Sequence, residues 1–485
     1  MNRLATVAAL SLAALPLAAM PDAALAQAKP RLFVLTDIGN EPDDQMSLVR
    51  LLLYSNEIEI EGIVATTSVW QRTKTSPKIA AGVIGAYGEV LPRLRQHADG
   101  WPEQDLLLAR LTSGVAGYGL AAIDPDHPSS GALALLAAAR RDPIEPLWIA
   151  AWGGTATLAE ALMLARRTMT PQDLAALVAR LRVYPISDQD DAGPWLRHEF
   201  PDLFYIVSPS SQDGGDYARA TWTGISGDRY YRNGEGADFT TVSNEWLDVH
   251  IRKGPLGAHY PRYLFIMEGD TPSFLGLIPN GLNQLDQPSW GGWGGRYLLR
   301  QPAGEPRPIW TQGGDSFMRT TSADTVGGHT SDQATIWRWR QAFQNDFAAR
   351  IDWTIQPYAK ANHPPRVVVN GDAGQAPLRI KARTGEPFPL DAAGTSDPDH
   401  NRVSYHWFAY PEAGFTGTAP SPAVRIERPD AARPRVTVTA RCTPMWLPLA
   451  PCPSRNTVHL ILAATDNGKP ALTRYRRIIL VVNDD

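Results

Sequence analysis

The chain has 485 residues, of which 44% are hydrophobic and 20% are charged, as is usual for a soluble globular protein. Its formal net charge of −4 excludes a strongly basic surface of the kind that binds nucleic acid or an anionic membrane. The length is sufficient for one large and one small domain, and it leaves the oligomeric state open.

The first segment is typical of a secretory signal peptide. Arg3 supplies a short basic start, residues 4–20 are apolar and Ala-rich, and Ala24-Leu25-Ala26 is a small-x-small cleavage motif. The apolar stretch is short for a membrane span, and no later run approaches the length that a span needs. We expect a signal peptide over residues 1–26, cleaved after Ala26 or alternatively after Ala28, and therefore a secreted or periplasmic protein.

Strand-like and helix-like segments alternate over residues 30–360. Short apolar runs that predict strands occupy residues 31–37, 58–67, 146–151, 182–186, 203–208 and 263–267. Helical patterns occupy residues 43–55, 130–141, 155–167, 171–181 and 331–353. This alternation predicts an α/β domain with an open, mostly parallel sheet and helices on both of its faces.

The pattern changes after the helix-incompatible segment Asn362-His363-Pro364-Pro365. Alternating runs at residues 366–369, 403–408, 435–440, 458–463 and 476–482 have the period of two that is typical of strands. They predict an Ig-like β-sandwich over residues 361–485, with Trp407 buried in it. The only two cysteines, Cys442 and Cys452, favour a disulfide over free thiols in an exported chain.

The segment TDIGNEPDDQM, residues 36–46, places four carboxylates directly behind the first predicted strand. Asp43 and Asp44 fall in the first turn of a helix, where the helix dipole favours negative charge, but Asp37 lies at the strand end and has no such explanation. The carboxyl ends of strands form the ligand-binding edge of an open α/β sheet. Carboxylates that converge there are tolerated when a hard cation neutralises them, and calcium suits an exported protein.

These residues resemble a known fingerprint. Asp37, Gly39, Asp43 and Asp44 resemble the amino-terminal motif of nucleoside hydrolases. Residues 62–67, 152–159 and 269–272 resemble three later motifs of those enzymes in the same order.

The whole chain more closely resembles a family of cellulose-binding proteins with a nucleoside hydrolase-like domain and a carboxyl-terminal Ig-like domain. The resemblance is carried by TDIGNEPDDQMS, YPISDQDDAG, EGDTPSFLGLIPNGL and WGGWGGRY, and in the sandwich by DPD and TDNGKPALTRYRR.

The resemblance implies a calcium site. Asp37, Asp44 and Asp270 would bind Ca²⁺ through their side chains, and Ala156 would do so through its main-chain carbonyl. Asp43 would hold sugar hydroxyls. Asp37 would also accept a proton from the water that attacks the anomeric carbon, which is coherent chemistry for cleavage through an oxocarbenium-like state.

Three departures from the nucleoside hydrolase pattern argue against a plain nucleosidase. Glu41-Pro42 adds two residues before the Asp pair, Trp70-Gln71 stands where the family has a ribose-contacting Asn, and Gly269 replaces a frequent His. A substitute general acid could come from Glu268, Asp190, Asp191 or His329, and the sequence does not decide among them.

The remaining candidates are substrate contacts that each have a structural alternative. Gln71, Gln189 and Asp191 lie in loops after predicted strands, and the run 189–191 reads equally well as a solvated turn. Trp290 and Trp293, separated by glycines, could stack on a sugar or pack in a core. Asp397 and Asp399 favour a turn over a calcium site.

The sequence therefore predicts an exported, calcium-dependent glycoside hydrolase acting on a saccharide, in keeping with its 15 Trp residues. Two alternatives stay open. One is a carbohydrate-binding, cellulose-directed protein whose hydrolase site is degenerate, and the other is a true nucleoside hydrolase that cleaves N-glycosidic bonds.

Overall fold

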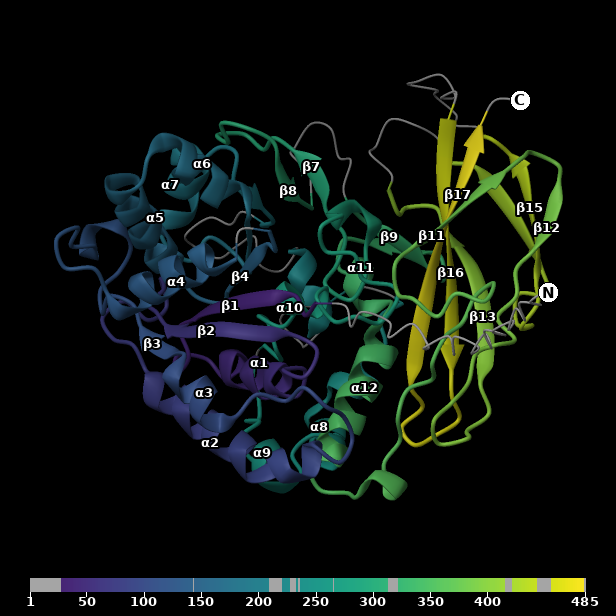
Figure 1. Ribbon diagram of the computed structural model, residues 1–485, viewed down its shortest axis with the longest axis horizontal. Coiled ribbons are helices and arrows are strands. Elements are labelled where there is room, and N and C mark those ends of the chain that lie inside the picture. The colour runs from purple at the N-terminus through teal and green to yellow at the C-terminus, as the bar shows by residue number, and fades with distance from the viewer. Residues whose placement is uncertain are drawn as a thin grey trace, which may run out of the picture.

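The computed structural model describes residues 28–142, 144–208, 220–226, 233, 236–264, 266–312, 322–414, 421–442 and 455–483. The predicted signal peptide lies outside these residues. An α/β part and an all-β part lie side by side, with the long strands of the all-β part facing the α/β part (Figure 1). The predicted boundary at residues 360–361 falls between the helical turn Tyr358–Lys360 and the first bridge of the all-β part at Arg366.

A six-stranded parallel sheet forms the centre of the α/β part, in the order β3-β2-β1-β4-β5-β6. Its strands are β1 (Arg31–Thr36), β2 (Glu59–Ala65), β3 (Leu111–Ser113), β4 (Leu147–Ala151), β5 (Leu181–Pro185) and β6 (Phe204–Tyr205). All six residues of β1 are buried, as expected for a central strand that is covered on both faces. The strand order reverses between β1 and β4, and such switch points are where open α/β sheets bind ligands.

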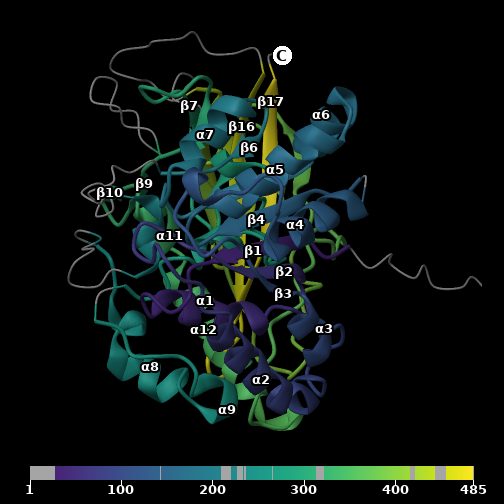
Figure 2. The same cartoon turned by 90° about the vertical axis from the view of Figure 1, so that its left-hand side faces the viewer.

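Helices cover both faces of the sheet, as predicted. α1 (Asp43–Leu52) and α2 (Pro77–Leu94) lie on one side of β1 and β2, and α4 (Ser130–Arg141) and α5 (Ala156–Thr168) lie on the other (Figures 1 and 2). The alternation of side chains along β1 divides the core accordingly. Leu32 and Val34 pack in the hydrophobic cluster of α1 and α2, whereas Phe33 and Leu35 pack in that of α4 and α5.

Further helices and strands complete this part. The helices are α3 (Gln104–Ala109), α6 (Pro171–Ala179), α7 (Ala192–Glu199), α8 (Asn244–His250), α9 (Gly254–Gly257), α10 (Pro272–Leu275), α11 (Ala334–Trp337) and α12 (Arg340–Trp353). Two small antiparallel pairs are β7 (Leu298–Arg300) with β8 (Ile309–Thr311) and β9 (Asp324–Val326) with β10 (His329–Ser331). None of the described helices is both long enough and apolar enough to span a membrane.

Two predicted elements differ from those observed. The helix predicted over residues 331–353 is divided into α11 and α12. The described residues of segment 263–267 form no strand; instead, the backbone N–H of Met267 donates to Ser226 Oγ, 3.1 Å away. An apolar run of this length can be buried in either form, and here tertiary contacts decide.

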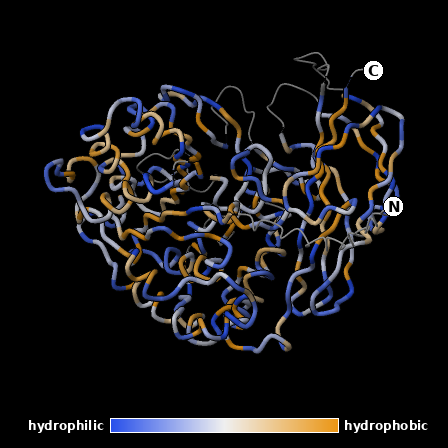
Figure 3. The backbone as a smooth tube through the Cα atoms, viewed as in Figure 1, coloured by the Kyte–Doolittle hydropathy of each residue, from blue (hydrophilic) through white to orange (hydrophobic). Residues whose placement is uncertain are grey.

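The all-β part is an Ig-like sandwich of two sheets. One has the order β11 (Leu378–Ala382), β17 (Thr473–Asn483), β16 (Arg455–Thr465), β13 (Ser404–Tyr410), and the other β12 (Pro387–Pro389), β15 (Arg435–Ala440), β14 (Ala423–Glu427). Their facing side chains form a separate core that includes the predicted Trp407, and hydrophobic stretches line these strands in Figure 3. Cys442 is disulfide-bonded, and Cys452 lies outside the described residues.

The two parts share a core at their junction. Tyr410 and Tyr475 of the sandwich belong to the same hydrophobic cluster as Trp293 and Trp339 of the α/β part. Buried ion pairs reinforce the contact, since Arg474 of β17 lies 2.5 Å from Asp346 of α12. The parts are therefore packed as one body rather than joined only by a linker.

Candidate active site and metal centre

The acidic segment after β1 opens into a small pocket at the carboxyl edge of the sheet. Its polar lining consists of Asp37, Glu41, Asp43, Asp44, Gln189 and Asp270, and its apolar lining of Trp70, Trp152, Ile186, Trp222 and Ile266. Most of these residues follow the ends of β1, β2, β4 and β5 or lie in the segment before α10, and Trp222 lies in the 3-10 turn Thr221–Ile225. The site thus lies at the switch point where the sheet topology places ligands.

The loop between β1 and α1 is held in place by local contacts. Gly39 has a φ of +102°, and a Cβ at this position would lie 2.8 Å from Ile79 Cδ1, so the turn requires glycine. Thr36 Oγ1 donates to the Asp44 carboxylate and accepts from the Ile38 N–H. These contacts direct Asp43 and Asp44 into the pocket from the first turn of α1.

Three buried carboxylates meet in the pocket. Asp43, Asp44 and Asp270 each offer an oxygen within 4.8 Å of those of the other two. Burial, followed by repulsion from neighbouring carboxylates, raises the pKa of all three well above the ordinary value for aspartate. Two of their buried oxygens, Asp43 Oδ1 and Asp270 Oδ2, have no hydrogen-bond partner. This arrangement fits a metal ion, because oxygen-rich clusters of this kind suit hard cations.

Asp37 borders the same pocket from the end of β1. Its carboxylate accepts from Ser68 Oγ, and its main-chain carbonyl accepts from Gln71 Nε2 at 2.9 Å. Burial raises the pKa of Asp37 as well. Gly153 allows the end of β4 to approach, since a Cβ there would lie 2.8 Å from Asp37 Cβ. Asp37 therefore lies beside the compact triad.

The structure brings together most, but not all, of the ligands that the sequence predicts. Asp37, Asp44 and Asp270 line one pocket, and Asp43 joins the closest set. Ala156 does not line the pocket; it begins α5, and its N–H donates to Asp190 Oδ2 at 2.9 Å.

Asp190, which the sequence predicts as a candidate catalytic acid, does not line the pocket. It accepts from Thr155 Oγ1 at 3.1 Å, from the Ala156 N–H and from the Ala192 N–H at 3.0 Å, so it fixes the start of α5 and of α7. Burial raises its pKa to about 6. Asp191 accepts from the Leu120 N–H at 2.8 Å and is also outside the pocket.

Glu268 is a structural residue in this fold, which corrects its prediction as a catalytic acid. Its fully buried carboxylate lies 2.6 Å from Arg50 Nε and accepts from Tyr260 Oη at 2.6 Å and Thr271 Oγ1 at 2.9 Å. A carboxylate with these partners is held in the core, away from the pocket lining. His329 lies in β10 and does not line the pocket either.

The two predicted stacking tryptophans lie at the domain junction. Trp293 is 0% exposed and packs edge-on against Phe343 and Tyr475, so it has no free face for a sugar. Trp290 packs edge-on against His459 of β16. The stacking interpretation is therefore wrong for Trp293. Trp290 instead packs against the sandwich, which matches the structural alternative to sugar stacking.

The glutamines divide in a similar way. Gln189 lines the pocket and donates through Nε2 to the Trp152 carbonyl. Gln71 does not line the pocket; its Nε2 donates to the main-chain carbonyl of Asp37, and its Oε1 is buried without a hydrogen-bond partner.

Sequence reasoning missed Glu41 and the aromatic wall of the pocket. Glu41 is recognisable in the acidic run as part of an insertion, but nothing in that run shows that its side chain lines the pocket. Trp70 is 45% exposed at the pocket, whereas Trp152 and Trp222 are buried in its wall. A short loop with Trp next to Gln71 was the only signal for Trp70.

Comparisons with known proteins agree with the two-part fold. A family model described as "Cellulose-binding Sde182, nucleoside hydrolase-like domain" matches residues 31–297, and one described as "Cellulose-binding protein Sde0182, C-terminal domain" matches residues 387–482. No curated protein matches the chain.

Solved structures similar to this chain include a nucleoside hydrolase-related hypothetical protein from Saccharophagus degradans that is associated with carbohydrate metabolism. It is 32% identical, with a TM-score of 0.76, and the match covers 94% of this chain and 100% of that one. The effector protein XOO4466 and the type III effector XopQ, the latter complexed with adenosine diphosphate ribose, are 12% and 13% identical. Their TM-scores are 0.33 and 0.32, and each match covers 68% of this chain and 95% of the other.

Proposed function

Because this chain belongs to the family of Sde182 cellulose-binding proteins with a nucleoside hydrolase-like domain, we propose that it is an exported, calcium-dependent glycoside hydrolase acting on a saccharide. The observation that carries this proposal is the buried acidic pocket. Three mutually repelling carboxylates, with unpartnered oxygens on Asp43 and Asp270, are costly to keep out of water unless they serve a cation and a reaction.

Asp43, Asp44 and Asp270 would hold Ca²⁺ in this proposal. These residues would thereby position and polarise a coordinated water, so that a neighbouring carboxylate can take its proton. Asp37, beside the triad, accepts the proton of the attacking water. The negative charge of the pocket stabilises the positive charge that develops on the sugar ring as the glycosidic bond breaks.

Glu41 is the pocket acid that remains for protonating the leaving oxygen. It lines the pocket outside the triad, whereas Asp190 and Glu268 are engaged elsewhere by helix starts and by Arg50. Its side chain is only partly buried, so it can reach a substrate that sits over the mouth of the pocket.

Two observations favour a saccharide over a nucleoside. A Cβ on Gly269 would lie 2.7 Å from Asp43 Oδ2, so this position has no room for the His that assists a departing base in nucleoside hydrolases. The half-exposed ring of Trp70 offers instead an apolar surface beside the acids, on which a pyranose face can stack.

One observation favours the alternative of a carbohydrate-binding protein without hydrolytic activity. The acidic pocket encloses only about 20 Å³, which is room for an ion or a water but not for a sugar ring. A substrate must then bind across its mouth, or the loop must open.

The decisive experiment is a turnover assay on β-linked glucans, xylans, mannans, aryl glycosides and nucleosides, each in calcium and in chelator, with a cellulose pull-down in parallel. We expect calcium-dependent release of reducing sugar that is lost in Asp44→Asn. Cellulose binding without turnover on any substrate, and insensitive to chelator, would support the binding protein. Release of free base would support the nucleoside hydrolase.

A further inference from the structure

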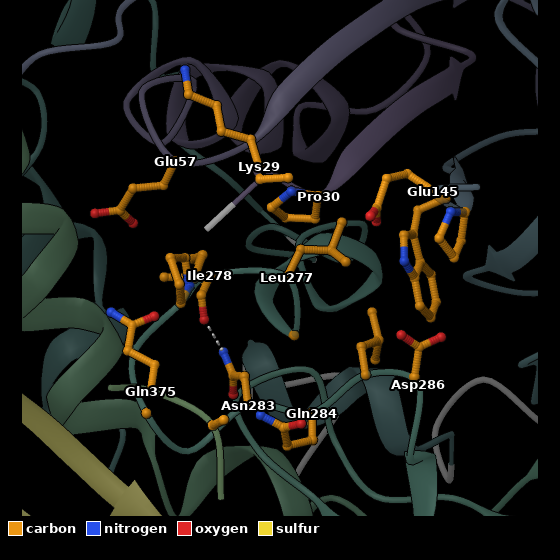
Figure 4. A pocket seen from close by; sticks show the side chains of 18 of the residues that line it. Lys29, Pro30, Glu57, Glu145, Leu277, Ile278, Asn283, Gln284, Asp286 and Gln375 are labelled. Atoms are coloured by element: carbon orange, nitrogen blue, oxygen red, sulfur yellow. Dashed lines mark hydrogen bonds between the residues drawn. The ribbon is translucent and has the colours of Figure 1, made fainter. Parts of the chain in front are cut away.

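A second, larger cavity lies at the opposite edge of the sheet from the acidic pocket. It encloses about 640 Å³ and is lined by Pro30, just before β1, by Glu145 and Pro146, just before β4, and by Gln375 and Ala376 of the sandwich (Figure 4). We call it the seam pocket, because both parts of the chain contribute to it. The six residues of β1, roughly 20 Å in length, separate Pro30 at the seam pocket from Asp37 at the acidic pocket.

We propose that the seam pocket is a second carbohydrate-binding site, which takes a short stretch of a neutral oligosaccharide and is independent of the acidic pocket. Its volume lies within the range of roughly 300–1,000 Å³ that is usual for small-molecule sites, and such sites often form at domain interfaces. The proposal does not depend on hydrolysis at the acidic pocket.

The lining has the mixed character that a pyranose requires. Trp148, Leu277, Ile278 and Leu285 supply apolar atoms, and these side chains belong to the buried core, so this side of the cavity is rigid. Sugar rings present C–H groups on their faces and hydroxyls around their edges. An apolar floor with a polar rim can therefore contact both parts of a ring.

The polar rim carries hydrogen-bonding groups of both kinds. Glu57, Gln284, Asp286 and Gln375 line the cavity and are labelled around it in Figure 4. Glu57 Oε2 is buried without a hydrogen-bond partner, although the other oxygen of this carboxylate lies 2.6 Å from Arg350. The side-chain amides can both donate and accept, as can the hydroxyls of a sugar.

Two of the carboxylates that line the cavity are already ion-paired. Glu57 is paired with Arg350, and Asp286 lies 3.1 Å from Arg182. Lys29 Nζ, which also lines the cavity, donates to the Gly100 carbonyl at 2.5 Å. Arginines balance Glu57 and Asp286, so the remaining lone pairs of these two carboxylates can accept from hydroxyl donors. Asp99 and Glu145 also line the cavity and are exposed, so the cationic probe in the test below is needed to separate a neutral from a cationic ligand.

The test compares oligosaccharide binding in variants of the seam pocket. Binding of cellohexaose and xylohexaose is measured by calorimetry in chelator, with chitosan hexamer as a cationic probe. Gln284→Ala combined with Gln375→Ala removes rim amides, and Ala376→Trp fills the cavity from an exposed loop. Gln287→Ala, an exposed glutamine of the same loop as Gln284 that does not line the cavity, is the matched control.

We expect at least one neutral hexaose to bind, and both seam variants to weaken it about tenfold or more, as the loss of two hydrogen bonds implies. Gln287→Ala should leave binding unchanged. Unchanged affinity in both folded seam variants, absence of binding by either neutral hexaose, or binding of chitosan alone would overturn the proposal. Turnover at the acidic pocket is scored separately, so its failure would not be confused with failure here.

Discussion

The acidic triad leads to a prediction about stability: one substitution should stabilise the protein without metal and remove most of the stabilisation that metal provides. Asp270→Asn preserves the size of the side chain and removes one negative charge. We expect the variant to be more stable than the native protein in chelator, and to gain little from calcium. An ordinary buried aspartate with hydrogen-bond partners would show the reverse, because its removal destabilises.

The size of the effect follows from the spacing of the carboxylates. Two unit charges no more than 4.8 Å apart repel by at least about 3.5 kcal/mol at an effective dielectric constant near 20. The substitution removes two of the three pairs, so it would relieve about 7 kcal/mol or more if all three acids were ionised. Their raised pKa means that the triad holds protons instead and avoids most of this repulsion. We expect a gain of about 2 kcal/mol, or roughly 2 °C in Tm for a chain of this length.

The assay is thermal unfolding of both proteins in chelator and in a calcium titration. Calcium at 100 times its Kd should stabilise the native protein by about 2.7 kcal/mol, because the ion binds only the folded state. Asp105→Asn, an exposed aspartate of α3, is the control and should change neither value.

The reasoning is refuted if Asp270→Asn unfolds at a lower temperature than the native protein in chelator, or if both proteins gain the same stabilisation from calcium. The first result would mean that the carboxylate is stabilised by contacts other than a metal. The second would place the calcium site elsewhere.

Four further predictions concern the same pocket. Asp37→Asn should lower turnover by about 10²–10⁴-fold even in saturating calcium, as measured by reducing-sugar release; full activity would remove Asp37 from the reaction. Trp70→Ala should raise KM for oligosaccharides with less change in kcat, whereas Trp293→Ala should mainly lower Tm. Glu41→Gln should slow cleavage of alkyl glycosides but spare aryl glycosides, whose leaving groups need no proton; equal losses on both would argue against an acid. In chelator, the stability advantage of Asp270→Asn should vanish below about pH 4 and grow towards pH 7, because raised pKa values make the folded native protein bind more protons than the unfolded chain; an advantage constant with pH would contradict the assignment.

The parts of the fold that the sequence predicts are those with a local signal. β1 and the acidic loop after it are adjacent in the chain, so the apolar run and the helix dipole are sufficient to place Asp37, Asp43 and Asp44 at one edge of the sheet. The sandwich follows from its period of two. Both patterns can be recognised in the sequence without knowledge of contacts between distant residues.

The errors concern residues whose roles depend on distant partners. Glu268 pairs with Arg50, 218 residues earlier, and no local pattern in the sequence indicates that its partner is a buried arginine. Trp293 is covered by Tyr475 of the sandwich, so its glycine-rich neighbourhood wrongly indicated an exposed loop. Similarly, Asp43 rather than Asp37 completes the closest triad because the first turn of α1 directs it there.

The Glu268 correction also explains how the acidic pocket is held closed. Arg50 and Asp43 stand at opposite ends of α1, so the ion pair with Glu268 ties the segment that carries Asp270 to the helix that carries Asp43. Glu268 has a φ of +56°, a strained value for a non-glycine residue, and it lies only two positions before Asp270. A second tether runs from Thr271 Oγ1 to Ser47 Oγ at 2.9 Å, also on α1.

Repulsion within the triad pushes these two segments apart, and the tethers oppose it. Removing one partner of a fully buried ion pair typically costs about 3–5 kcal/mol, which exceeds the residual repulsion of about 2 kcal/mol in a triad that holds protons. The core behind the pocket is thus built to keep Asp270 against Asp43 and Asp44 when no cation is present. In the proposed metal site, a cation would therefore enter a preformed site and would not have to assemble it, and the strained backbone at Glu268 is part of what holds the site in that form.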